Sequence, residues 1–175
     1  MNEIIKKNGI TFGIILGIFS VLFTTLIYVI DLNLFTSWWF GSASIVITII
    51  IGIVLVQKTK KELRTMTFKE GFTVYFIAAA IGSLISTVYY YVLFNLIDPQ
   101  AKETLKEITL KYTSDMMVKF GAPASAVNEA MQKAAETDNY SLGSLSMGYA
   151  IGLVISAIFG LILAAIFKSK TPEHL

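Results

Sequence analysis

The side chains that carry acid–base, nucleophilic and metal chemistry are scarce in this sequence and stand away from its apolar segments. There is no cysteine and one histidine, His174, which precedes the last residue. The carboxylates nearest the apolar segments, Asp31, Glu70 and Asp98, lie at their edges. A metal site, a serine nucleophile with its base and a proton relay all need such groups within the fold. The sequence therefore favours a protein without a catalytic centre, cofactor or metal.

The composition indicates an integral membrane protein. Of 175 residues, 55% are hydrophobic and 15% are charged, and the mean hydropathy is +0.69. Soluble domains average about 45–50% apolar and about 25% charged residues. The net charge of +2 is too small to suggest nucleic-acid binding. The length allows one membrane domain with a small insertion.

Four uncharged apolar segments are each long enough for a helix of about 20 residues, which crosses a hydrocarbon core of about 30 Å. They cover residues 10–30, 37–57, 72–96 and 142–167. The first segment could be a signal peptide, but it is too long and Tyr28 to Asp31 offers no cleavage site. Ile45 to Val56 could form a buried strand, but an open sheet edge cannot lie in lipid. We therefore predict an all-α protein with four transmembrane helices.

Small or hydroxyl-bearing residues recur at every fourth position in all four segments, which predicts close helix packing. In the second segment they are Ser44, Thr48 and Gly52. The predicted packing residues are Gly13, Gly17, Ala78, Gly82, Ser86, Gly148, Gly152, Ser156 and Gly160. Packing among the four helices of one chain is favoured over self-association, because four such ridges can satisfy one another. A homo-oligomer remains compatible with the pattern.

Basic residues predict the orientation of the helices. The ends and the connection between the second and third segments carry Lys6, Lys7, Lys58, Lys60, Lys61, Arg64, Lys69, Lys168 and Lys170. The remaining five lysines all lie in the long connection before the fourth segment. The positive-inside rule therefore places both termini in the cytoplasm. Trp38, Trp39 and Tyr89 to Tyr91 then lie near the outer interface, which such aromatic residues prefer.

Residues 98–138 predict an amphipathic helical hairpin outside the membrane. Asp98 and Pro99 are a preferred helix cap and first residue, Gly121 ends the first helix, and Pro123 opens a second. The apolar stripe of the first helix comprises Leu105, Ile108, Tyr112, Met116 and Phe120. A hairpin of this size cannot form its own core. We expect its stripe to rest on the lipid surface, on the ends of the spans or on a protein partner.

Two short stretches and a general pattern resemble a known family. The stretches are Thr67-Phe68-Lys69-Glu70-Gly71-Phe72 and Asn95-Leu96-Ile97-Asp98-Pro99, and the turn at Gly121 and the glycine-rich last segment are also similar. Together they resemble a bacterial family catalogued as a domain of unknown function, number forty-one ninety-nine. The resemblance implies four spans in a bacterial inner membrane and supplies no activity. Ala124-Ser125-Ala126 departs from the more acidic pattern of that family.

Three hypotheses on function follow. The first is an accessory or scaffold protein that binds a protein partner through the hairpin stripe. The second is a lipid- or small-molecule-binding, transport-related protein with a cavity lined by Tyr75, Tyr90, Ser86, Thr87, Asn95 and Tyr149. The third, an enzyme, is disfavoured because perturbed titratable groups usually mark active sites, and the sequence shows no such groups within the apolar segments.

Overall fold

The described part of the chain, residues 2–169 of a computed structural model, contains helices and no strand. In order, the elements are α1 (Glu3–Ile30), the 3-10 helix η1 (Leu32–Thr36), α2 (Trp38–Leu63), α3 (Phe68–Val92), the π-helical turn η2 (Leu93–Ile97), α4 (Pro99–Lys119), α5 (Ala124–Glu136) and α6 (Leu142–Phe167). The predicted all-α fold class is confirmed. His174 and Lys170, both used in the sequence analysis, lie outside the described residues.

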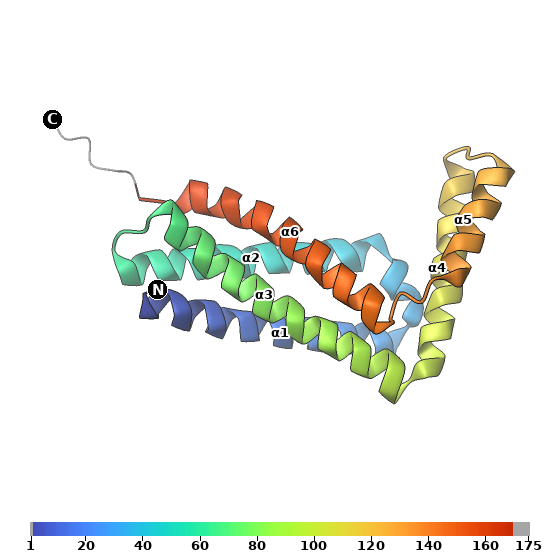
Figure 1. Ribbon diagram of the computed structural model, residues 1–175, viewed down its shortest axis with the longest axis horizontal. Helices are drawn as coiled ribbons and strands as arrows, with labels where there is room; N and C mark the ends of the chain where they lie inside the picture. Colours follow the sequence, from blue (N-terminus) through green and yellow to red (C-terminus); the bar gives the residue numbers. More distant parts are fainter. Residues whose placement is uncertain (1, 170–175) are drawn as a thin grey trace.

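Four helices are long and apolar enough to cross a membrane: α1, α2, α3 with η2, and α6. They alternate in direction, so the first residues of α1 and the last of α6 lie at one end of the bundle (Figure 1). We call this the basic end, because it also holds the lysine-rich end of α2. The opposite end, crossed by α4 and α5, is the hairpin end (Figure 1). At the basic end, α1 and α2 extend beyond the apolar segments, since lysine and glutamate are good helix formers in water.

Helix α3 is the centre of the bundle and lies along both α1 and α6 (Figure 1). Its contact with α1 depends on glycine. A Cβ atom added to Gly13 would lie 2.7 Å from Cβ of Ile81, and one added to Gly82 would lie 2.7 Å from Cβ of Leu16. Gly17 faces α3 in the same way, and Ala78 is fully buried. The glycines of α1 therefore meet α3 of the same chain and are not free for a second copy.

The predicted ridge of α6 is wrong for its half nearer the hairpin. A Cβ atom added to Gly148 or Gly152 would have no neighbour within 4 Å, whereas one on Gly160 would lie 2.9 Å from the Tyr75 ring. The cause is helical geometry. Each step of four residues turns about 40° beyond a full circle, so three steps rotate the ridge by about 120°. Small residues at this spacing cannot all face one neighbour, and only the half of α6 near the basic end turns its small residues inward.

The entry to α3 is fixed by local hydrogen bonds. Thr67 accepts from the backbone N–H of Glu70, and the Glu70 carboxylate accepts from the backbone N–H of Thr67 at 2.8 Å. This reciprocal capping box satisfies two backbone donors that a helix start leaves unpaired. The sequence analysis did not identify this role for Glu70. At Gly71, an added Cβ would lie 3.3 Å from Cα of Ala164, so α6 approaches closely there.

At the hairpin end, Asp98 links the bundle to α4. Its carboxylate accepts from the Ala101 N–H at 3.0 Å, which caps α4, and from the Tyr28 hydroxyl of α1 at 2.7 Å. These hydrogen bonds, that from Tyr28 first, hold the pKa of the Asp98 carboxyl below its usual value. An apolar cluster forms where the first turns of α4 meet η2, and Phe94 and Leu105 are almost fully buried in it. The predicted cap is therefore also a connection between the spans and the hairpin.

Candidate ligand cleft

A cleft lined by apolar side chains and hydroxyl groups opens between α2 and the other long helices, in the half of the bundle towards the hairpin. It consists of two adjoining cavities, of about 220 and 320 Å³, which share Ser20 of α1 and Ser44 of α2. The first is lined by Leu16, Phe19, Ser20, Ser44, Thr48, Tyr75, Ala79, Gly82, Ser83, Ser86 and Ser156. The second continues to η1 and is lined by Ser20, Phe23, Thr24, Ile27, Leu34, Phe35, Phe40, Gly41, Ser44, Ile45 and Tyr90. No lining residue is ionised at neutral pH.

The cleft exists because α2 packs tightly only near the basic end. All buried residues of α2 lie from Gly52 onwards, and those of α6 from Gly160 onwards. Asn8 of α1 strengthens this end by donating to Glu62 of α2 at 2.9 Å and to Thr59 at 3.2 Å. The halves of α2 and α6 nearer the hairpin have no buried residue, so these two helices pack closely only towards the basic end.

Tyr75 forms the floor of the cleft. An added Cβ on Gly52 would lie 2.8 Å from Cε2 of its ring, and one on Gly160 would lie 2.9 Å from Cδ1. The ring therefore fills the space between α2 and α6 that two glycines leave open. It is 7% exposed and contributes to the lining of the cavity above it.

The hydroxyl groups of the cleft fall into two sets. Ser20 and Ser86 share a hydrogen bond of 2.7 Å, and Ser83 donates to a backbone carbonyl of its own helix. For Ser44, Thr48, Ser156 and Tyr75, by contrast, residues 2–169 supply no hydrogen-bond partner. A polar group without a partner is costly in a medium that lacks water. These four hydroxyls are therefore available to a molecule that enters the cleft.

The predicted cavity residues are only partly brought together. Tyr75, Ser86 and Tyr90 line the cleft. Thr87 instead donates to a backbone carbonyl of α3. The amide of Asn95 donates to the Tyr140 carbonyl, and the Tyr149 hydroxyl donates to that of Ala80. Ser156, predicted to pack against another helix, faces the cleft instead.

The sequence analysis missed the contributions of α1 and α2 to the cleft. Ser20, Ser44 and Thr48 were not among the predicted cavity residues, although Ser44, Thr48 and Gly52 form a polar and small stripe along α2. That stripe is the signal that could have identified this wall. A stripe of this kind usually indicates helix packing, and only the separation of α2 from its neighbours shows that half of it faces a cavity.

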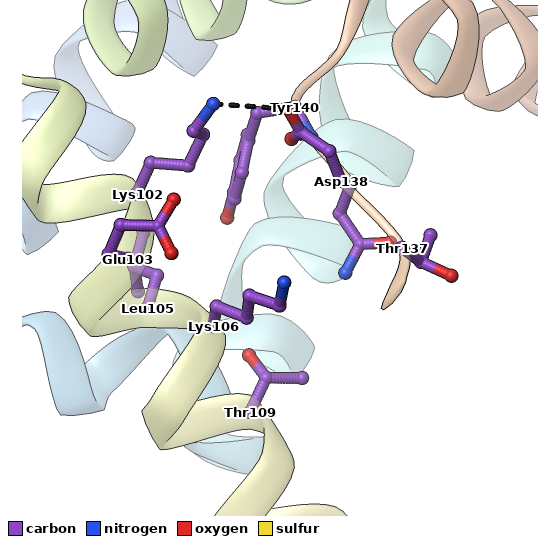
Figure 2. A pocket seen from close by; sticks show the side chains of 9 residues that line it. Lys102, Glu103, Leu105, Lys106, Thr109, Thr137, Asp138 and Tyr140 are labelled. Atoms are coloured by element: carbon purple, nitrogen blue, oxygen red, sulfur yellow. Dashed lines mark hydrogen bonds and ion pairs between the residues drawn. The ribbon is translucent and has the colours of Figure 1, made fainter. Parts of the chain in front are cut away.

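A second, smaller hollow lies at the base of the hairpin (Figure 2). Its volume is about 80 Å³, and Lys102 crosses it to form a 3.0 Å ion pair with Asp138. Burial raises the pKa of Asp138, but hydrogen bonds from Lys102 and the backbone more than offset this, so the pKa is lowered overall. Burial raises the pKa of Tyr140 to about 12. Lys102 and Tyr140 thus join α4 to the start of α6, and we assign this hollow a structural role.

The predicted hairpin stripe is divided between the fold and the surface. Leu105 is 1% exposed, within the apolar cluster beneath α4, whereas Tyr112 is 42% and Phe120 79% exposed. Ile108 and Met116 are half-buried. The first residue of the stripe is therefore buried against the bundle, and the residues towards the tip of the hairpin are increasingly exposed.

Among residues 2–169, no group of three or more histidine, cysteine, aspartate or glutamate side chains could hold a metal ion. A protein-family model described as "Protein of unknown function (DUF4199)" matches residues 11–169. The matched range includes the hairpin, all of α2, α3 and α6, and most of α1. No curated protein and no solved structure matches the chain.

Proposed function

The chain belongs to this family of proteins of unknown function, and from that premise we propose that it binds an uncharged amphipathic molecule within a membrane. The ligand is a lipid or a small apolar molecule that carries a hydroxyl or carbonyl group. One observation supports the proposal above all others: Ser44, Thr48, Ser156 and Tyr75 line the cleft, and their hydroxyls have no hydrogen-bond partner among the described residues.

The proposed membrane is the cytoplasmic membrane of a bacterium, with the basic end and both termini in the cytoplasm. The lysine-rich ends of α1 and α2 support this orientation through the positive-inside rule. Trp38 and Trp39, at the opposite end of the bundle, also support this orientation. They stack at 4.1 Å, are more than half exposed, and start α2 at the hairpin end, where an aromatic belt is expected.

The lining of the cleft defines the chemistry of the ligand. A charged group would enter a space with no counter-charge, and burying an unpaired charge is strongly unfavourable. A hydroxyl or carbonyl can exchange hydrogen bonds with serine, threonine and tyrosine, which both donate and accept. The apolar part of the ligand would contact Phe19, Phe23 and Phe40. Because α2 and α6 separate towards the hairpin end, the ligand would enter sideways from the bilayer.

The same lining supports binding and not catalysis. A serine hydroxyl becomes a nucleophile only when a base takes its proton. The cleft contains no histidine, carboxylate or lysine that could act as that base. We therefore assign its hydroxyls to ligand recognition.

The proposal is tested by photo-cross-linking in phosphatidylcholine nanodiscs. The probe is a long-chain alcohol with a diazirine in its chain. In the test variant, Ser44→Ala, Thr48→Val and Ser156→Ala are combined. The control combines Ser42→Ala and Ser146→Ala, on exposed positions of the same two helices. The probe should label peptides of α2 and α6, and labelling should fall about tenfold or more in the test variant, since each lost hydrogen bond contributes about 0.5–1.5 kcal/mol.

A second probe examines the absence of charge. The corresponding carboxylate should label the cleft much less than the alcohol. Labelling spread evenly over lipid-exposed positions such as Ile50 and Ile158, and equal in both variants, would refute a specific cleft. Preference for the carboxylate would refute the proposed class of ligand.

A further inference from the structure

Helix α4 rests on the bundle only through its first turns. Ala101 and Leu105 are buried against η1, η2 and the end of α1. From there the hairpin runs across the long axis of the bundle, and its tip extends past the start of α6 (Figure 1). The second half of α4 therefore overhangs the region beside the bundle, level with its hairpin end.

The face of α4 that contacts the bundle continues along this overhang. Around the helix axis, Tyr112 and Met116 lie within about 20° of Leu105, and Phe120 lies within about 60°. Glu107 lies about 160° away, on the opposite face. In a helix without a sharp bend, residues on one face point in the same direction. Tyr112 and Phe120 therefore point the same way as Leu105, towards the level of the hairpin end of the bundle.

Exposure changes along this face where the bundle ends. Leu105 is 1% exposed, Tyr112 42% and Phe120 79%. Helix α5 packs along α4 but leaves these two aromatic side chains uncovered. Lys119 lies about 40° from Leu105 on the same face. Aromatic side chains favour the boundary between headgroups and acyl chains, and a lysine beside them can lay its apolar stem along that boundary while its charge stays in water.

We propose that the hairpin lies on the lipid surface at the hairpin end, with Tyr112 and Phe120 at the boundary of headgroups and acyl chains. The occupant of the stripe is thus the bilayer that surrounds the bundle, and Lys119 contacts lipid phosphate. The inference depends on the proposed membrane placement but is independent of the ligand cleft. It accounts for an apolar stripe that extends beyond the bundle and that no other part of residues 2–169 covers.

The absence of cysteine makes a direct test simple. Full-length single-cysteine variants Tyr112→Cys, Phe120→Cys and the control Glu107→Cys are labelled with an environment-sensitive fluorophore. They are reconstituted in phosphatidylcholine vesicles at a low protein-to-lipid ratio. Phospholipids with a nitroxide near the headgroup should quench the fluorophore at residues 112 and 120 several-fold more than at 107. Aqueous iodide should give the reverse order.

Equal access of iodide to all three positions, with little quenching by lipid, would overturn the proposal. The stripe would then be free for a protein partner. Before labelling, quenching of Trp38 and Trp39 by the same nitroxide lipids reports whether the bundle itself is inserted, so failure of the hairpin inference is distinguished from failure of the membrane placement. Because Phe120 is 79% exposed, its replacement leaves the core unchanged. If Tyr112→Cys lowers the yield of folded protein, the result at position 120 alone tests the proposal.

Discussion

Replacing Gly82 by alanine tests the close contact between α1 and α3, and the same change at Gly152 is the matched control. The added methyl at Gly82 would lie 2.7 Å from Cβ of Leu16 and 3.2 Å from the carbonyl oxygen of Gly13. Carbon atoms rest at about 3.5–4.0 Å, so the overlap is roughly 1 Å. Neither neighbour is the end of a flexible side chain, so α1 itself must move. Overpacking of this kind costs about 1–3 kcal/mol.

At Gly152 the added methyl would meet nothing within 4 Å. Both glycines lie inside helices, so the gain in helix propensity, of up to about 1 kcal/mol, is shared by the two variants and cancels in their comparison. Gly82→Ala should therefore unfold about 2–12 °C below Gly152→Ala, if each kcal/mol shifts the midpoint by about 2–4 °C. The four-residue spacing predicts instead that Gly152 packs against another helix, so that substitutions there should also destabilise the fold.

Both variants are purified in the same detergent, and unfolding is followed by tryptophan fluorescence and by the loss of the monodisperse peak. Gly152→Leu is included, and the structure predicts a yield close to that of the unmodified chain. Equal midpoints for the two alanine variants would show that α1 and α3 are not in close contact at Gly82. A lower unfolding midpoint for Gly152→Ala than for Gly82→Ala would show that Gly152 packs closely against another helix.

The remaining predictions concern the hairpin and the orientation. Because the folded-state pKa of Asp98 is depressed, its stabilisation is complete above the unfolded-state pKa of about 3.9 and is lost as pH falls through the lower folded value. Acid should thus loosen the hairpin, measured by proteolysis. Asp98→Asn should weaken that pH dependence, and the Lys102–Asp138 ion pair accounts for the part that remains. In whole cells, Lys61→Cys should react with an impermeant maleimide only after permeabilisation, and Glu129→Cys should react before; the opposite order would invert the orientation.

The helices and caps were predictable from sequence because their causes are local. A run of about 20 uncharged apolar residues fixes a span, and Asp98 followed by Pro99 fixes the start of α4. The capping box of Thr67 and Glu70 was also readable from residue types three apart. The orientation of the hairpin relative to the bundle could not be predicted from the sequence, because it depends on the contact between Tyr28 and Asp98, which are far apart in the chain.

Helix faces were harder to predict than helices. The sequence locates the small residues of α6 but does not reveal where α3 crosses them, so Gly160 and Gly152 were treated alike. The walls of the cleft from α1 and α2 were missed for a related reason. Ser44 and Gly52 belong to one stripe of α2, and only the three-dimensional arrangement separates the packed half from the open half. Packing distance between helices depends on side chains from several elements and has no local signal.

The residues on which the sequence resemblance is based differ in kind from those of the cleft. Glu70 and Asp98 are bonded to backbone donors, and Asn95 bonds the Tyr140 carbonyl. Their presence is explained by the fold, since each polar group meets a partner that the fold itself supplies. Ser44 and Thr48 have no such explanation. In an apolar medium a hydroxyl without an internal partner needs one from outside. The proposed binding activity should therefore be sought at the unpaired hydroxyls of the cleft and not at the most recognisable motifs.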